Sequence, residues 1–102
     1  MIIVIGTIEV DPAQRDQFLA SQTDVFAETR KEPGCIGYSL LVDPEEPGVV
    51  RLLEQWEDVP SFDQHLKALG AAAKEGKTPL GHDAVRSFGI TRHDVESSSK
   101  LA

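Results

Sequence analysis

His65 is the residue of this chain best placed to exchange a proton near neutral pH. The helix that follows Asp58 buries one apolar stripe, made of Phe62, Leu66, Leu69 and Ala73. At about 100° per residue, His65 lies roughly 60° to one side of Phe62, so it borders this stripe. A histidine there is half desolvated and half reachable, and the ordinary pKa of histidine, about 6.5, lets small changes of environment decide its charge.

A carboxylate and a guanidinium stand on strand faces that are otherwise apolar. Alternation along the strand that precedes Asp58 puts Glu54 beside Trp56, and alternation over 84–94 puts Arg86 beside Phe88. A carboxylate in such a place lies at a sheet edge, pairs with an arginine or lines a pocket. Arg86 is therefore a candidate partner of Glu54, or a cation that anchors a ligand.

The elements that would position these residues follow from periodicity and punctuation. Strands are expected over 2–10, 35–42, 49–56 and 84–94, one helix over 12–31, and a second from 59 to the glycine at 76. Asp11 and Asp58 are the expected N-caps, and Gly34 ends the first helix. The order β-α-β-β-α-β predicts an α+β, ferredoxin-like fold: a four-stranded antiparallel sheet with both helices on one face.

The second face of such a sheet would be left bare, yet the strands carry apolar residues at both parities. Ile3 and Ile5 alternate with Ile2, Val4 and Ile8 on the first strand. An exposed apolar patch of this kind marks an interface. We therefore expect a symmetric homodimer in which two sheets close into an α+β barrel.

Composition sets the broad class of the molecule. The 102 residues, 40% hydrophobic and 26% charged, predict one soluble domain over residues 1–95, followed by a disordered tail over 96–102 that resembles vector-derived sequence. A formal net charge of −7 disfavours nucleic acid and anionic membranes as partners. The single cysteine, Cys35, and the lack of a visible secretion signal fit the cytoplasm. The sequence has no cluster of cysteines or histidines, so it does not predict a metal site.

Three motifs occur in order along the chain: EPGCIGY over 32–38, EQWED over 54–58, and then Phe62 with His65. Together they resemble the antibiotic biosynthesis monooxygenase family. The pattern in that family is roughly E-x-G-C-x-x-Y on the second strand, E-x-W on the third, and a histidine nine residues beyond the tryptophan. The likeness extends over residues 1 to about 95 and is greatest to the small quinol monooxygenases.

The resemblance implies a dimer, a pocket between helices and sheet, and oxidation of a small electron-rich aromatic by molecular oxygen without metal, haem or flavin. A hydroquinone or anthrone-like substrate would have to lose a phenolic proton in a dry cavity, which requires a base, a cation or donor, and aromatic walls. His65 is the candidate catalytic base. The candidate substrate-binding residues are Tyr38, Glu54, Trp56, Phe62, Leu69 and Arg86.

Other functions stay open at this point. Relatives often carry a second histidine five residues after the first, where this chain has Gly70. Haem-degrading members of the fold use an asparagine on the first strand and a histidine late in the second helix, near Gly6 and Glu75 of this chain. The alternatives are a non-catalytic dimer that binds a small molecule, an isomerase of small phosphorylated ketones, or a haem-binding protein.

Overall fold

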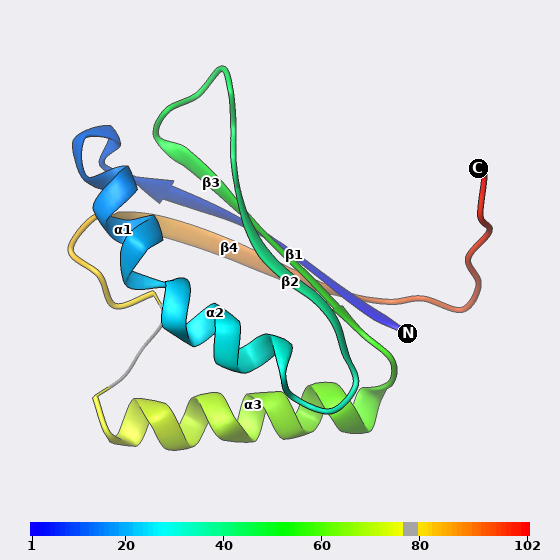
Figure 1. The fold of residues 1–102 in the computed structure, drawn as a ribbon. Helices are drawn as coiled ribbons and strands as arrows, with labels where there is room; N and C mark the ends of the chain where they lie inside the picture. Colours follow the sequence, from blue (N-terminus) through cyan, green and yellow to red (C-terminus); the bar gives the residue numbers. More distant parts are fainter. Residues whose placement is uncertain (77–79) are drawn as a thin grey trace.

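The computed structural model describes residues 1–76 and 80–102 and has the predicted ferredoxin-like fold (Figure 1). One antiparallel sheet has the strand order β2-β3-β1-β4, and its strands are β1 Ile2–Val10, β2 Cys35–Val42, β3 Val49–Trp56 and β4 Val85–Asp94. The helices are α1 Arg15–Ser21, α2 Thr23–Arg30 and α3 Val59–Lys74, with a short 3-10 turn at Pro12–Gln14. All three helices lie on the same side of the sheet (Figure 1).

The two predicted N-caps are confirmed. The Asp11 carboxylate accepts a hydrogen bond from the Ala13 N–H at 3.0 Å, and the Asp58 carboxylate accepts one from the Ser61 N–H at 2.9 Å. Each cap satisfies an N–H group that a helix start leaves without a partner. The Asp58 cap fixes where α3 leaves the end of β3, and this sets the position of the helix residues that follow.

The single helix predicted over 12–31 is wrong, because the chain breaks it at Gln22 into α1 and α2. Gln22 has φ −93° and ψ −8°, and its N–H donates to Leu19 O over a tightened turn. The Ser21 hydroxyl donates to Phe18 O at 2.6 Å. Serine back-bonding of this kind competes with the helix ladder and bends helices. The bend lets α1 and α2 follow the twist of the sheet while both keep an aromatic residue against it.

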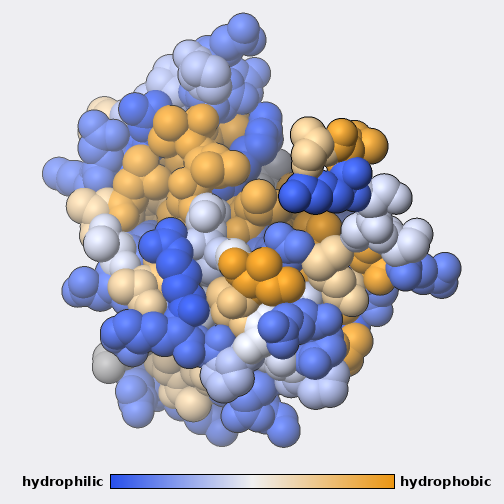
Figure 2. Space-filling view, turned by 45° about the vertical axis from the view of Figure 1, so that its right-hand side comes forward, coloured by the Kyte–Doolittle hydropathy of each residue, from blue (hydrophilic) through white to orange (hydrophobic). Residues whose placement is uncertain are grey.

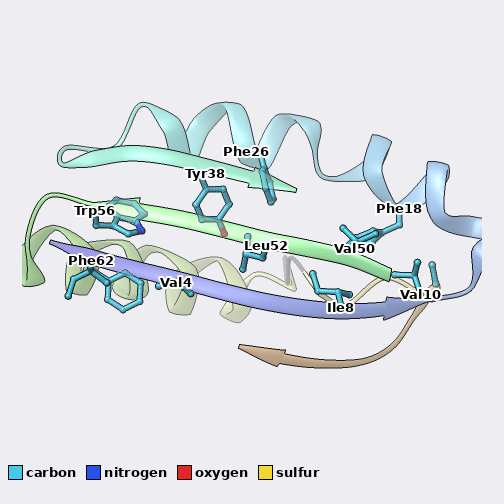
Figure 3. Close-up of a cluster of buried hydrophobic side chains, with 12 residues drawn as sticks. Val4, Ile8, Val10, Phe18, Phe26, Tyr38, Val50, Leu52, Trp56 and Phe62 are labelled. Atoms are coloured by element: carbon cyan, nitrogen blue, oxygen red, sulfur yellow. The ribbon is translucent and has the colours of Figure 1, made fainter. Parts of the chain in front are cut away.

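One face of the sheet carries the hydrophobic core (Figure 3). Strand residues of one parity point into it, and Phe18 and Phe26 of the helices close it from above. The buried members are Ile2, Val4, Ile8, Val10, Phe18, Phe26, Tyr38, Val50, Leu52, Trp56, Phe62 and Ala84. Burying a large apolar side chain stabilises the fold by roughly 1.5–3 kcal/mol, so this face holds most of the folding energy.

The opposite face of the sheet is not covered by any helix among residues 1–76 and 80–102. Ile5 lies directly across from Leu53 on β3 and from Thr91 on β4, and both apolar side chains are exposed. Leu41 is also exposed on this face, which we call the open face. Figure 2 shows hydrophobic residues gathered over one part of the molecular surface, with hydrophilic residues around them.

The last strand begins at Val85, one residue later than predicted, and the chain after it leaves the sheet. Residues 96–102 form neither helix nor strand and extend away from the domain (Figure 1). From its two glycines and its proline, the sequence also predicts that the loop over 76–82 forms a lid or a rim; residues 77–79 of this loop lie outside the described part of the chain. Among the described residues, no helix is long and apolar enough to span a bilayer.

Candidate functional site

A cavity of about 220 Å³ lies between the helices and the core face of the sheet. Its walls come from β1, α1, α2, β2, β3, α3 and β4, and most of them are apolar. The lining residues are Ile8, Phe18, Gln22, Phe26, Tyr38, Leu40, Leu52, Glu54, Leu69, Leu80 and Ile90. Only three of these side chains are polar. A ligand that enters would meet the carboxylate of Glu54, the phenol of Tyr38 and the amide of Gln22 in otherwise apolar surroundings.

Glu54 is the charged group in the cavity wall. Its residue is 5% exposed, and its Oε1 accepts a hydrogen bond from the Trp56 indole N–H at 3.0 Å. Burial raises the pKa of the Glu54 carboxyl, while the Trp56 hydrogen bond and nearby His65 act in the opposite direction. A carboxylate with a raised pKa is a stronger base than an exposed one, which suits proton transfer near neutral pH.

His65 lies behind Glu54 and does not line the cavity. The prediction of a half-reachable histidine is wrong, because His65 is only 2% exposed. Its Nδ1 lies 2.7 Å from Oε2 of Glu32, and its Nε2 lies 3.6 Å from Oε1 of Glu54. The imidazole also packs against the rings of Trp56 and Tyr38, with centroids 4.6 and 5.5 Å away. These four neighbours bury the imidazole, which the predicted position at the edge of the buried face would have left partly exposed.

The turn after α2 brings Glu32 to this place. Gly34 has φ +81°, which only glycine adopts readily, and a Cβ there would collide with Ser61. The Gly34 carbonyl accepts the Glu57 N–H at 2.9 Å, which holds the turn against the start of α3. His65 lies one helical turn beyond Ser61 on α3. The close contact between Gly34 and Ser61 therefore also sets the distance between Glu32 and His65.

Tyr38 is the second polar residue of the cavity wall. Its ring packs edge-on against Phe26, with centroids 4.4 Å apart. Burial, and then the charges of Glu54 and Glu32, raise the pKa of the Tyr38 hydroxyl. The phenol therefore keeps its proton at neutral pH and can donate a hydrogen bond to a ligand.

Arg86 does not reach the site, and the predicted Glu54–Arg86 ion pair is wrong. The β1–β4 register shifts between Glu9 and Val10, so Arg86 falls in a bulge at the far end of the sheet. Its side chain is 64% exposed and lies 3.6 Å from Asp11. Another cation of β4, Arg92, has its guanidinium 5.4 Å from the centre of the Phe62 ring.

The structure places the predicted site residues in two layers. Tyr38, Glu54 and Leu69 line the cavity, whereas Trp56, Phe62 and His65 form a layer behind Glu54. Two further residues were not identified from the sequence. Gln22 lines the cavity midway between Phe18 and Phe26 at four-residue spacing, a pattern that could have indicated a polar group on the buried face. Glu32 begins the EPGCIGY motif, which supported the family resemblance, but it was assigned no role at the site from the sequence.

Gln22 has an unpaired buried oxygen. The Ser21 hydroxyl donates to Phe18 O, so it can only accept from the Gln22 side-chain amide, which it does at 3.1 Å. This fixes the orientation of the amide and leaves Oε1 of Gln22 buried without a partner among the described residues. An unpaired buried acceptor costs about 1–3 kcal/mol, which a ligand hydroxyl would offset.

The described residues contain no group of three or more histidine, cysteine, aspartate or glutamate side chains arranged to hold a metal ion. Cys35 is a free, half-buried thiol, and burial raises its pKa. The titratable side chains that the described residues bring together at the site are Glu54, His65, Glu32 and Tyr38.

Comparison with known proteins identifies the family. The family model described as antibiotic biosynthesis monooxygenase matches residues 1–75. The chain belongs to the antibiotic biosynthesis monooxygenase family. A protein of Pestalotiopsis microspora, named a putative monooxygenase, is 28% identical over 94 residues that cover 92% of this chain and 74% of that protein. An uncharacterized protein of Synechocystis is 33% identical over 65% of this chain, but the match spans only 45% of that protein.

Solved structures agree on the fold of this monooxygenase-family chain. A crystal structure described as an antibiotic biosynthesis monooxygenase superposes with a TM-score of 0.73 at 26% identity, covering 95% of this chain and 100% of the other. A haem-degrading protein of Mycobacterium tuberculosis superposes with a TM-score of 0.74 over 98% of this chain and 100% of the other. Its identity is 16%, so that likeness concerns the fold alone.

Proposed function

We propose that this chain is a cofactor-independent monooxygenase that oxidises a small, electron-rich aromatic with molecular oxygen. The observation that carries the proposal is the buried carboxylate of Glu54 in the wall of an otherwise apolar cavity, held by Trp56 and backed by His65. Family membership and relatives named as monooxygenases support it.

The size of the cavity indicates the size of the substrate. Ligand pockets usually have volumes of about 300–1,000 Å³, and about 220 Å³ lies below that range. A one-ring or two-ring hydroquinone fits this volume better than a three-ring anthrone. Phe18 and Phe26 supply aromatic walls, and Tyr38 supplies a hydroxyl that can donate to a substrate oxygen.

The chemistry needs a base that touches the substrate and a place for the proton. Glu54 faces the cavity and takes the phenolic proton, and His65 accepts it from behind through Nε2. The electron-rich anion then passes an electron to O₂ in a site shielded from water. A carbon–oxygen bond forms, and loss of water from the resulting peroxide leaves a carbonyl, so one oxygen atom ends in the product and the other in water.

Oxygen uptake against a panel of hydroquinones tests this function. Purified, metal-free protein is expected to consume one O₂ per substrate and release no hydrogen peroxide. Glu54→Gln should lower the rate by roughly 10²-fold, the usual range for losing a positioned base. The matched control is Glu45→Gln, an exposed loop residue that should keep full activity. Binding of the aromatics with no oxygen uptake above the uncatalysed rate would instead assign a non-catalytic binding module.

We also propose that a second copy of the chain covers the open face. Ile5, Leu41 and Leu53 are exposed there, and a standard interface buries about 800 Å² per partner. Light scattering at micromolar concentration should give a dimer mass for the wild type and a lower mass for Leu53→Lys. Leu66→Lys on α3 is the control that should stay dimeric, because Leu66 is 47% exposed and the prediction that it belongs to the buried stripe is wrong. A monomer mass for the wild type would contradict this arrangement. We also propose that the protein is located in the cytoplasm.

A further inference from the structure

Three side chains form a line from the cavity to the outside of the molecule. Glu54 lines the cavity, His65 lies behind it, and Glu32 lines an adjoining groove of about 630 Å³ between α2 and α3, which shares Gln22 and Leu69 with the cavity wall. The Glu32 side chain is 27% exposed, whereas that of His65 is 1% exposed. His65 is therefore a buried bridge between a carboxylate that faces the cavity and a carboxylate that faces the groove.

The contacts of the imidazole define where its proton lies. An ionised carboxylate only accepts hydrogen bonds, so the 2.7 Å contact between Oε2 of Glu32 and Nδ1 of His65 places a proton on Nδ1. Nε2 is buried and has no hydrogen-bond partner among the described residues. Its lone pair is a free acceptor that lies 3.6 Å from Oε1 of Glu54.

We propose that Glu54, His65 and Glu32 form a proton relay that carries the phenolic proton from the cavity to the α2–α3 groove. The proposal rests on the proposed function and extends it to Glu32, which acts through His65 as a positioning residue. Glu54 takes the proton from the substrate oxygen and passes it to Nε2. The proton on Nδ1 moves to Glu32 and from there to water in the groove. The 3.6 Å gap must close by several tenths of an ångström, as catalytic hydrogen bonds do when substrate binds.

The proton balance closes over one turnover. Deprotonation of the substrate sends one proton outward, and breakdown of the peroxide to a carbonyl and water takes one proton back. The returning proton enters at Glu32, restores Nδ1–H, and releases the Nε2 proton to Glu54 and the peroxide. The relay therefore ends in its starting state, and the buried ring does not have to rotate.

The other titratable groups around the relay do not compete for this proton. Tyr38 on β2 and Cys35 at its start face the same space, and burial raises the pKa of both groups. Both therefore keep their protons at neutral pH. The nearby cation is Arg30 of α2, whose guanidinium is engaged with the Tyr38 carbonyl at 2.9 Å. The mobile proton is thus confined to the two carboxylates and the imidazole.

The relay is tested first without turnover. Nitrogen-15 NMR of the histidine side chains reports which ring nitrogen carries a proton. In the free wild type, His65 is expected to be protonated at Nδ1 and bare at Nε2. Saturation with 4-cyanophenol, an electron-poor phenol that keeps its proton in solution at neutral pH and resists oxidation, should place a proton on Nε2 in the wild type and leave Nε2 bare in Glu54→Gln. An Nε2 signal that 4-cyanophenol leaves unchanged in the wild type would overturn the relay.

The second arm uses Glu32 variants with a matched control. Glu32→Gln should lower kcat about tenfold with KM changed less than twofold, and it should flatten the pH profile of kcat. Formate should restore part of the rate of Glu32→Ala through the open groove. Glu28→Gln removes a charge from the same groove without contacting His65, and it should behave as the wild type. Full activity in Glu32→Gln, or a loss that formate cannot rescue, would leave Glu32 as a structural partner and overturn the relay.

The two arms separate failure of the relay from failure of the function. Proton transfer to Nε2 with no oxygen uptake on any hydroquinone would support the relay and contradict the monooxygenase. Oxygen uptake with no change at Nε2 and normal kinetics in Glu32→Gln would support the monooxygenase and contradict the relay.

Discussion

The rings of His65 and Trp56 lie with their centroids 4.6 Å apart and their planes inclined by 31°. Through its N–H, the same indole holds Oε1 of Glu54 at 3.0 Å. Trp56 therefore positions both members of the acid–base pair, one by its face and one by its edge. The spacing of nine residues between tryptophan and histidine places them on successive elements, β3 and α3, which meet at the Asp58 cap.

His65→Gln should lower turnover of an active hydroquinone by roughly 10²-fold or more, because the amide cannot accept the proton that Glu54 releases. The variant keeps a polar group near Glu32 but loses the ring stacked on Trp56, so we expect a loss of about 1–3 kcal/mol in unfolding free energy. Steady-state kinetics and urea denaturation measure both effects. His93→Gln, at an exposed position on β4, is the control that should change neither. Wild-type turnover in a destabilised His65→Gln would make His65 a core residue only.

The raised pKa of Glu54 predicts how stability depends on pH. The folded state holds the Glu54 proton more tightly than the unfolded state, so between the ordinary glutamate pKa of 4.5 and the raised value the native protein binds more protons. The contribution of this group to stability is full below the ordinary pKa and is lost as pH rises through the folded pKa.

Unfolding free energies measured as a function of pH, for the wild type and two variants, isolate the contribution of Glu54 to stability. The unfolding free energy of the wild type minus that of Glu54→Gln should fall as pH rises above 4.5, whereas the difference for the exposed Glu45→Gln should stay flat over the same range. If the difference between the wild type and Glu54→Gln instead rises with pH, the folded state stabilises the charged form of Glu54, which would contradict the raised pKa.

Gly6→Ala should narrow the cavity. A Cβ at this position would lie 3.1 Å from Ile90 Cγ1 and 3.2 Å from Leu52 Cβ, and both neighbours line the cavity. Crowding of this kind usually costs about 1–3 kcal/mol, and the affinity for a hydroquinone measured by calorimetry should drop several-fold. Gly89→Ala is the matched control, since a Cβ there meets nothing within 4 Å. Equal hydroquinone affinity in Gly6→Ala and Gly89→Ala would show that Gly6 does not border the ligand site.

Gln22→Leu should raise stability while weakening substrate binding. The substitution removes the unpaired Oε1, at the loss of one hydrogen bond to Ser21, so the net gain in unfolding free energy should be about 1 kcal/mol. If Oε1 accepts a substrate hydroxyl, KM for a hydroquinone should rise several-fold, and KM for its monomethyl ether should change less. A destabilised variant with unchanged KM would mean that the amide has a structural partner instead.

The sequence predicted the fold because its signals are local. The caps at Asp11 and Asp58, the glycine at 34 and the strand alternation each act within a few residues, and together they define the order of the elements. The break at Gln22 was not predicted, since it depends on a serine hydroxyl that bonds back to the helix and on the fit of two aromatic residues to the sheet.

The site was predicted less well because it depends on contacts distant in sequence. Periodicity placed His65 at a helix border, but the turn at Gly34 brings Glu32 over the ring and completes its burial. Arg86 was predicted to share a buried face with Phe88, yet β4 is an edge strand whose residues from Arg86 to Asp94 are all exposed, and a one-residue bulge leaves Arg86 beside Asp11. A bulge changes which face a residue occupies and leaves little trace in the pattern of apolar residues.

Oxygen-isotope labelling tests the central claim most directly. Metal-free protein is incubated with a hydroquinone that it consumes, under ¹⁸O₂ in ordinary water, and the product is analysed by mass spectrometry. We expect one ¹⁸O atom in each product molecule formed and the second in water, with the labelled product nearly absent in Glu54→Gln. A product that carries no ¹⁸O, with the oxygen recovered as hydrogen peroxide, would contradict the account and make the protein an oxidase.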